Sequence, residues 1–377
     1  MKAARIVAVS RKEFLHILRD PRSLGMGIAI PILLLVIYGY ALTMDVDEVP
    51  LVVWDQSATP QSRELVSGFT GSRYFALRGH VSSYPELERA IDSRQAMAAL
   101  VIPADFARQI AAGRPVAVQM IVDGSDSNTA TIALGYAAVV AETYSQAVTM
   151  QQMRRVLARP PDPPLELRPR VWFNEELESR NYIVPGLIAV MMMMIAAMLT
   201  SLTVAREWER GTMEQLISTP VKGPELILGK LLPYLAIGLL DTVIAVVMGR
   251  FVFDVPLRGS VALLFAVATV FLAGGLSLGI LVSIVTRNQL MASQLAALLT
   301  LLPSVLLSGF VFEILSMPEP IRLFTYVIPA RYFLDILRGI YLKGIGLEIL
   351  AGEVLLLIVF SGAMVVLATR KFRKKLV

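Results

Sequence analysis

Six long apolar runs limit this chain to a protein that lives in a lipid bilayer. A helix that crosses the hydrocarbon core needs about 20 consecutive apolar residues. Four of the runs carry no charged residue, and the other two carry one acid each, Asp241 and Glu353. The runs are Ser23–Met44, Tyr182–Ala205, Leu231–Gly249, Ser260–Val285, Gln289–Phe312 and Ile349–Thr369. Only 17% of all residues are charged, which is below the roughly 25% of soluble domains. We therefore predict six transmembrane helices.

Basic residues near both ends of the chain predict how these helices are oriented. Lys and Arg in short loops and tails stay on the cytoplasmic side of the membrane. Such residues gather in both tails: Lys2, Arg5, Arg11, Lys12, Arg19, Arg22, Arg370, Lys371, Arg373, Lys374 and Lys375. Both termini are therefore expected in the cytoplasm, which requires an even number of spans and agrees with six. The first run is too long for the apolar part of a signal peptide, so we interpret it as a retained anchor.

The first 44 residues divide into two predicted helices. Residues 1–22 combine basic residues with an apolar face, which is typical of a helix lying in the membrane interface on the cytoplasmic side. That face consists of Ala3, Val7, Phe14 and Leu18. Residues 23–44 form the first predicted transmembrane helix.

Residues 45–181 predict an extracytoplasmic α/β domain, because strand-like and helix-like segments alternate along them. The expected strands are Val49–Trp54, Tyr74–Gly79, Met97–Ile102 and Val116–Val122. The expected helices are Gln61–Phe69, Tyr84–Arg94, Pro103–Ala112 and Asn128–Leu157. The order of the strands is not readable from the sequence. The predicted fold class is therefore an α-helical polytopic membrane protein, with six transmembrane helices and an inserted α/β extracytoplasmic domain.

The polar segment 206–222 follows the second span and is expected on the cytoplasmic side. Within Arg206–Pro220 the charges cluster in the first half, and Leu216 with Ile217 supplies an apolar spot. A new helix can begin at Gly211-Thr212, with Thr212 as the N-cap and Gln215 at the spacing of a capping box. A short amphipathic helix here suits the docking of another protein, and a solvated loop is the alternative.

This segment carries the strongest family resemblance in the chain. Arg206–Pro220, followed by Glu225 and Gly229-Lys230, closely resembles the signature of type-2 ABC exporter permeases. Further matches are Leu307–Phe310, Met317-Pro318, Ile328–Phe333 and Arg338-Gly339. The resemblance covers essentially the whole chain, as one span, a large outer domain and five further spans. Glu313 is a departure, because relatives often have Pro at that position.

The resemblance implies the permease subunit of an ATP-driven exporter in the bacterial inner membrane. It would move an amphipathic or lipophilic substrate, such as a drug or a lipid, out of the cytoplasm or the inner leaflet. Its implied partners are a cytoplasmic ABC ATPase, a second permease copy or a paralogue, and membrane lipid; a periplasmic adaptor is a further candidate. The substrate itself is not identified by any residue.

The resemblance also implies roles for particular segments of residues 182–377, which would form a five-helix transmembrane domain. The coupling segment 206–222 would contact the ATPase through Arg206, Glu207, Glu209, Arg210, Gly211, Thr212, Glu214, Gln215, Leu216, Thr219 and Pro220. Residues 303–346 would form a re-entrant hairpin on the outer side, with Pro303 starting the break in the fifth span. The hairpin residues of interest are Gly309, Phe310, Glu313, Pro318 and Pro329.

The sequence contains no nucleotide site of its own. A P-loop needs the pattern G-x-x-x-x-G-K-[S/T], and the only Gly-Lys pair, Gly229-Lys230, is followed by Leu. We therefore expect a subunit that is not an enzyme and that binds no cofactor, with ATP and Mg²⁺ held by the partner. The chain has no cysteine, and its two histidines are far apart in sequence, so a metal site is not expected. Nothing in the charge pattern indicates nucleic-acid binding.

Asp241 is the one ionisable residue well inside a predicted span. A carboxylate at that depth is costly and is a functional candidate by default. It could carry protons, contact a cation, or pair with a neighbouring polar group. A proton-coupled secondary transporter that uses Asp241 is therefore an alternative function, and a membrane-anchored sensor or assembly factor is another.

Overall fold

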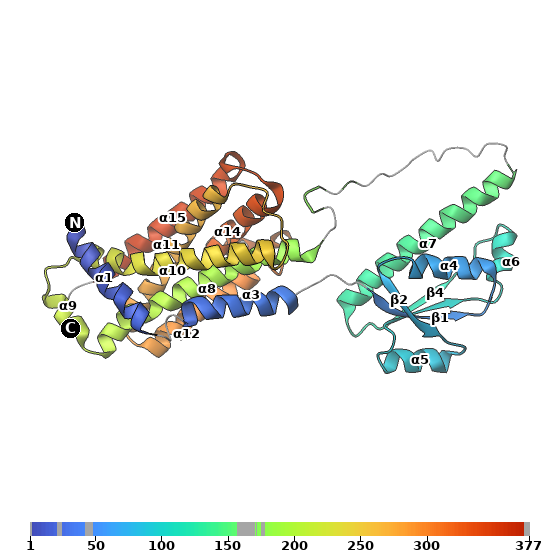
Figure 1. The fold of residues 1–377 in the computed structure, drawn as a ribbon, viewed down its shortest axis with the longest axis horizontal. Coiled ribbons are helices and arrows are strands. Elements are labelled where there is room, and N and C mark those ends of the chain that lie inside the picture. The colour runs from blue at the N-terminus through green and yellow to red at the C-terminus, as the bar shows by residue number, and fades with distance from the viewer. Residues whose placement is uncertain are drawn as a thin grey trace. The chain divides into compact units, whose positions relative to one another are not determined.

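The computed structural model of the protein describes residues 2–20, 25–41, 48–156, 170, 172–174 and 178–372. The chain divides into two compact units, which we call the membrane unit (Met1–Met44 and Arg170–Val377) and the α/β unit (Asp45–Pro169) (Figure 1). Both ends of the first predicted span lie outside the described residues, as does the basic tail after residue 372.

The α/β unit is built on a four-stranded sheet in the order β2-β1-β3-β4. The central strand β1 pairs in parallel with β2 and β3, whereas β4 is antiparallel to β3. The strands are β1 (Val49–Asp55), β2 (Phe75–His80), β3 (Ala98–Ile102) and β4 (Gln119–Val122). The helices are α4 (Pro60–Thr70), α5 (Tyr84–Asp92), α6 (Phe106–Ala111) and α7 (Ser127–Val156). Each strand and helix expected from the alternating pattern is present.

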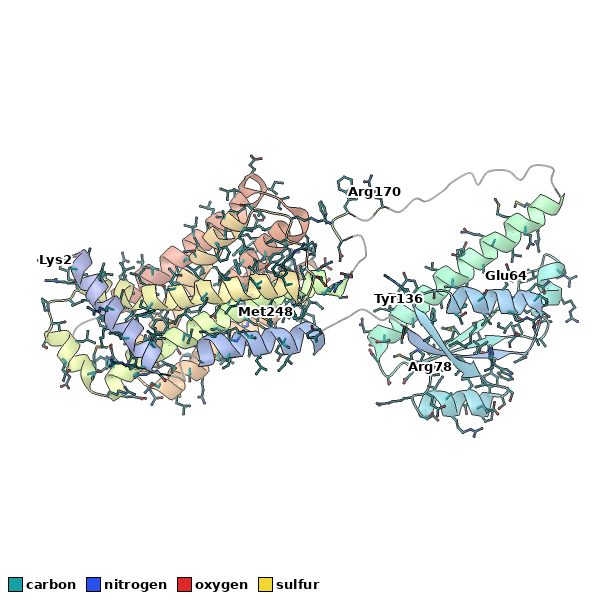
Figure 2. The ribbon with its side chains drawn as sticks, in the orientation of Figure 1. Lys2, Glu64, Arg78, Tyr136, Arg170 and Met248 are labelled. Atoms are coloured by element: carbon teal, nitrogen blue, oxygen red, sulfur yellow. The ribbon has the colours of Figure 1, made fainter. Side chains whose placement is uncertain are left out.

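Alternate side chains of β1 enter two separate apolar cores, because successive residues of a strand point to opposite faces. Leu51 and Val53 pack with residues of α4 and α7, whereas Val52 packs with Leu87 of α5. Helices therefore cover both faces of this sheet, and Figure 2 shows its side chains, with Tyr136 on α7. The ring of Tyr136 stacks on Tyr74 with the two centroids 3.9 Å apart.

The membrane unit is helical throughout its described part. Its amino-terminal helices are α1 (Ala3–Arg19), the π-helical η1 (Gly25–Ala29) and α3 (Ile30–Ala41). Its long helices are α8 (Ser179–Glu209), α10 (Gly223–Phe251), α11 (Val261–Thr286), α12 (Gln289–Leu306) and α15 (Leu347–Lys371). Its short helices are α9 (Thr212–Ser218), η2 (Ile314–Ser316), α13 (Glu319–Thr325), α14 (Pro329–Arg338) and η3 (Gly339–Lys343).

Among the described residues, five helices are long and apolar enough to cross a membrane, and Gly27–Ala41 is a shorter apolar helix. The prediction of a polytopic helical membrane protein is confirmed. The predicted fifth span is too long at its end, because α12 stops at Leu306 rather than at Phe312. The chain turns at Gly309, whose φ of 86° lies in the left-handed region that a side chain disfavours.

Helix α8 is the centre of the membrane unit and contacts α3, α10, α11, α12 and α14 (Figure 1). Its closest neighbour crosses it at Gly279 of α11, where an added Cβ would lie 2.2 Å from the carbonyl oxygen of Ala197. Near the same crossing, the Thr200 hydroxyl donates a hydrogen bond to the carbonyl of Leu276 at 2.8 Å. Lipid tails are as apolar as the helix surfaces, so the hydrophobic effect does not drive helices together within a membrane. Close packing at small residues and interhelical hydrogen bonds of this kind hold them together instead.

Candidate functional site

Three helices meet at a buried cluster of charges, which we call the charged junction and define as Glu13, Glu207 and Lys230. The Lys230 ammonium lies 2.7 Å from a Glu13 carboxylate oxygen and 3.0 Å from a Glu207 carboxylate oxygen. Its side chain is 1% exposed, and those of the two glutamates are 6% and 9% exposed. Because Glu13 belongs to α1, Glu207 to α8 and Lys230 to α10, the junction ties three helices together.

Helix α1 reaches this junction because one of its faces packs on α10. Val9 and Ile17 are buried on that face, and Glu13 lies one turn from each of them. Gly229 permits the close approach, since an added Cβ there would lie 2.6 Å from the Cβ of Val9. The sequence reasoning missed Glu13, although its spacing of four residues from both Val9 and Ile17 is a readable signal.

The opposite face of α1 remains open. Val7 is 65% exposed, Phe14 47% and Leu18 53%, so most of the apolar face expected from the sequence is free to contact lipid. One helix therefore has two apolar sides, of which only the side with Glu13 packs against protein.

Two further contacts attach the ends of α1. At its start, the Glu225 carboxylate accepts hydrogen bonds from the Lys2 amide at 2.8 Å and from Arg5 at 3.4 Å; Figure 2 labels Lys2. At its end, Arg206 of α8 forms an ion pair with Asp20 at 3.1 Å and a hydrogen bond with His16 at 2.7 Å. The helix is thus held to both neighbours along its whole length.

The electrostatics of the junction favour its charged form. Burial acts to raise the pKa of Glu13, but the charge of Lys230 and its hydrogen bond outweigh burial and hold that pKa below its ordinary value. Burial lowers the pKa of His16, and the neighbouring Arg206 lowers it further. At neutral pH the site therefore contains an ionised Glu13 and a neutral imidazole at His16.

Acidification should weaken the attachment of α1 through His16. A histidine whose folded pKa is lowered contributes stability that is complete above its ordinary pKa and is lost as the pH falls through the folded value. The ordinary value is 6.5. We expect the thermal midpoint of the purified protein to fall between about pH 8 and about pH 5, and to fall less in H16Q. Equal losses in the two proteins would contradict this assignment.

The short helix α9 lies between α8 and α10, within the segment singled out as a coupling segment. Arg210 ends α8, and Gly211 turns the chain with a φ of 70°. The prediction of Thr212 as the N-cap with a capping box is wrong: Gly211 is the N-cap, and it has no side-chain cap. The left-handed turn needs glycine, so the helix begins at Thr212, one residue earlier than the capping pattern indicated.

The coupling-segment residues separate into two groups. Glu214, Gln215, Thr219 and Pro220 are exposed, together with Arg210 and Gly211. Arg206 and Glu207 are instead occupied by the contacts with α1, and Glu209 accepts a hydrogen bond from the Gln289 amide at 2.8 Å. Thr212 and Leu216 are half-buried and line a cavity of about 640 Å³ between α1, the end of α8 and α9.

The residues of the expected outer hairpin also come together. The Gly309 carbonyl accepts hydrogen bonds from the Tyr182 hydroxyl at 3.0 Å and from Arg338 at 3.3 Å. Phe310 is buried against α8 at Gly186, where no side chain would fit beside its ring. Glu313 precedes η2, Pro318 precedes α13 and Pro329 begins α14, so these positions mark the starts of short helices.

Asp241 lies apart from both groups, on α10. It is 7% exposed and borders an apolar cavity between α3, α8, α10 and α11. In the described part of the chain, its Oδ1 atom has no hydrogen-bond partner.

The fold and these sites together define a polytopic helical membrane protein with an exposed short helix between two of its long helices. Comparison with known proteins gives the family. Residues 21–370 match the family described as ABC-2 family transporter protein. The chain belongs to this family.

Three relatives from Escherichia coli (strain K12) are similar to this chain over most of its length. "Probable multidrug ABC transporter permease YbhS" is 37% identical over 376 residues, which cover 99% of this chain and 97% of the relative. "Probable multidrug ABC transporter permease YbhR" is 29% identical over 371 residues, with 98% and 99% covered. "Inner membrane transport permease YhhJ" is 27% identical over 334 residues, with 86% and 85% covered.

The protein is therefore the permease subunit of an ATP-driven ABC exporter, as the sequence motifs predicted. A permease subunit is not itself an enzyme, and the family implies that it works with an ABC ATPase subunit. This assignment favours the exporter over the proton-coupled transporter and over the sensor or assembly factor.

Proposed function

We propose that α9 is the helix through which the ATPase subunit drives this permease. The observation that carries the proposal is that exposed residues of α9 lie between α8 and α10, the helices that carry Glu207 and Lys230 of the charged junction. The α9 residues Glu214 and Gln215 are exposed and available to a partner. Its two connections lead to α8 and α10. These two long helices are joined by the ion pair between Glu207 of α8 and Lys230 of α10.

The charged junction then determines which helices follow a displacement of α9. A cavity of about 640 Å³ lies beside α9, and Met213 anchors the helix in the apolar core of the membrane unit. A push on α9 reaches the ends of α8 and α10, and the ion pairs of Lys230 carry α1 along with them. Because packed helices shift as rigid bodies, this motion would change the spacing of the membrane helices far from the ATPase.

The topology that fits this mechanism has six spans. The apolar helix Gly27–Ala41 would belong to the first, which the sequence predicts over residues 23–44. The basic tails would keep both termini in the cytoplasm, and α1 would then lie in the inner interface, with Phe14 and Leu18 in lipid. The α/β unit between the first two spans would lie on the outer side of a bacterial inner membrane. The name of the relative YhhJ assigns that relative to an inner membrane.

The substrate would be amphipathic or lipophilic, in keeping with the multidrug names of YbhS and YbhR. Two permease subunits, identical or paralogous, would face each other with the export path between them. Helices α12 and α15 leave most of their surface unburied within this chain, which allows a second subunit or lipid to cover them. The α/β unit would be the contact for a periplasmic adaptor.

Charge reversal on α9 tests the coupling proposal. We expect E214K to weaken the affinity for the ATPase subunit at least about tenfold, which corresponds to about 1.4 kcal/mol of lost binding. Co-purification of the ATPase subunit and the ATPase activity of the preparation should fall with it. The thermal midpoint of the permease itself should change little, because Glu214 is exposed.

E348K is the matched control. Glu348, like Glu214, is an exposed acid in the first turn of a helix, so both variants lose the same favourable interaction with the helix dipole. In the proposed topology Glu348 lies on the outer side, and its reversal should leave ATPase binding unchanged. Full ATPase activity in E214K, or an equal loss in both variants, would exclude α9 as the coupling helix.

A further inference from the structure

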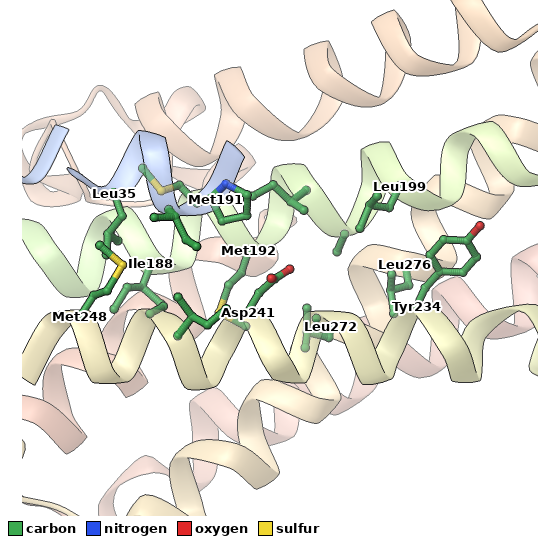
Figure 3. A pocket seen from close by; sticks show the side chains of 17 residues that line it. Leu35, Ile188, Met191, Met192, Leu199, Tyr234, Asp241, Met248, Leu272 and Leu276 are labelled. Carbon is green, nitrogen blue, oxygen red and sulfur yellow. The ribbon is translucent and has the colours of Figure 1, made fainter. Parts of the chain in front are cut away.

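The cavity beside Asp241 lies near the middle of the membrane. Asp241 is ten residues before the end of α10 at Phe251, which is about 15 Å along a helix and about half the thickness of the hydrocarbon core. The walls come from α3, α8, α10 and α11, and include Leu35, Met191, Met192, Met248 and Leu272 (Figure 3). Figure 3 shows the Asp241 carboxylate directed from α10 into this space, toward α8.

Among the described residues, Asp241 has no compensating charge. None of those that line the cavity is Lys, Arg or His, and none of the described residues forms a hydrogen bond with Oδ1. The neighbouring Thr242 hydroxyl does not help, since it donates to the carbonyl of Gly238 at 2.8 Å. An acid in the membrane interior normally pairs with a cation or faces a functional cavity. Because Asp241 is 7% exposed, another protein chain cannot reach it from outside.

The lining residues indicate what kind of cation fits. Of the described residues that line the cavity, Asp241 and Tyr234 alone carry a side-chain oxygen. Inorganic cations such as Ca²⁺ and Mg²⁺ need six or more oxygen ligands, including water, so these walls suit them poorly. The remaining walls are aliphatic or are methionines, whose flexible thioethers adapt to apolar ligands of varied shape. A single carboxylate in such walls matches a cation whose charge is attached to a large apolar body.

The cavity is contracted in this conformation. Its free volume is about 30 Å³, which holds about two water molecules. A larger ligand enters only if a wall moves, and α3 is the wall best suited to move. It begins after the π-helical segment Gly25–Ala29 and carries Pro31, which has no amide hydrogen to donate to the helix. Its outer side is exposed, with Leu33 57% and Ile37 49% exposed, so the opening would face lipid.

We propose that this cavity is the contracted form of a binding site for lipophilic cations, in which Asp241 supplies the counter-charge and α3 opens the entrance from the membrane. The proposal rests on the proposed export of lipophilic substrates and specifies their charge. The site lies within one subunit rather than between two, and its ligand enters from the lipid.

Binding of tetraphenylphosphonium to the purified permease–ATPase complex in lipid nanodiscs tests the site. We expect D241N to weaken that binding at least about tenfold, whereas D241E, which keeps the charge, retains most of it. D254N is the matched control, because Asp254 is exposed after the end of α10. Tetraphenylborate has the same shape and the opposite charge, and its binding should not weaken in D241N. Equal tetraphenylphosphonium affinity in D241N and wild type would overturn the proposal.

A second measurement does not depend on changing Asp241. The chain has no cysteine, so single cysteines can be placed in the wild-type background. Tetraphenylphosphonium should protect A245C, which lines the cavity, from N-ethylmaleimide, and should not protect V247C, which is 47% exposed on the same helix. Equal protection, or none at A245C, would overturn the site.

The role of ATP separates this proposal from the exporter mechanism. If tetraphenylphosphonium binding depends on Asp241 but does not respond to ATP, the binding site is supported and its coupling to export is contradicted. If the complex exports other compounds with ATP but no tetraphenylphosphonium binding depends on Asp241, the exporter function is supported and the proposed cation site is excluded.

Discussion

K230M should be among the most destabilising single substitutions in this protein, with a loss of about 3–5 kcal/mol in the free energy of unfolding. The Lys230 ammonium is 1% exposed and lies between Glu13 at 2.7 Å and Glu207 at 3.0 Å. Methionine fills the same space but removes the one buried cation, so Glu13 and Glu207 keep only the exposed Lys12, at 3.9 and 3.0 Å. The two carboxylates are then poorly compensated, and each has to take up a proton or expose itself to water, which weakens the attachment of α1 to α8 and α10. The loss can be measured by denaturant titration in detergent, followed through Trp208 fluorescence in a W54F/W172F background.

K12M is the matched control. Lys12 approaches the same Glu207 oxygen at 3.0 Å, but its side chain is 57% exposed. A solvated ion pair contributes at most about 1 kcal/mol, so K12M should cost much less than K230M. The triple variant E13Q/E207Q/K230M removes all the charges and should recover part of the loss. Similar losses in K12M and K230M would show that burial of the lysine is not what makes the junction important.

G279A should also be strongly destabilising, although it adds a single methyl group. The new Cβ would lie 2.2 Å from both the Ala197 carbonyl oxygen and the Thr200 hydroxyl oxygen. Backbone on α8 cannot rotate away as a side chain can, so α11 has to move outward. That movement also stretches the hydrogen bond from Thr200 to Leu276. We expect a loss of about 3 kcal/mol, at the upper end of the usual range for overpacking, measured by the same titration.

Two other glycines make G279A part of a graded series. At Gly275 an added Cβ would meet the Met193 sulfur at 3.2 Å, and this side chain can adjust. At Gly362 of α15 it would meet nothing within 4 Å. G362A should therefore be neutral or stabilising by up to about 1 kcal/mol, because alanine favours a helix, and G275A should fall between the two. A series in any other order would mean that the contact between α8 and α11 does not limit stability.

The long helices and the α/β unit follow from local signals. Uninterrupted apolar length predicts the spans, and strand and helix patterns predict the elements of the α/β unit, because each depends on residues close together in the chain. Pro318 and Pro329 likewise mark the starts of α13 and α14. The location of α9 was predicted from its position between two spans, but its first residue was not. That boundary depends on the left-handed turn at Gly211, which a capping pattern does not reveal.

The charged junction could not be read from the sequence in the same way. Glu13 and Lys230 are separated by 217 positions. Glu13 follows other charged residues, and Lys230 comes directly before an apolar run, so neither stands out in the sequence. Their pairing depends on how α1 lies across α10, which Gly229 permits by the absence of a side chain. The sequence motif also grouped Glu207 and Glu209 with the exposed Glu214, whereas the fold turns the first two toward neighbouring helices.

The sequence by itself determined that this chain is a polytopic helical membrane protein, and its motifs indicated an ABC exporter permease. Those properties depend on the length and composition of local segments. Only the tertiary structure decided which charges neutralise one another and which do not. Lys230 has two carboxylate partners, whereas Asp241, which is just as isolated in the sequence, has only an apolar cavity beside its free oxygen. The physical reason is that compensation of a buried charge depends on distances of a few ångströms between helices that are distant in sequence.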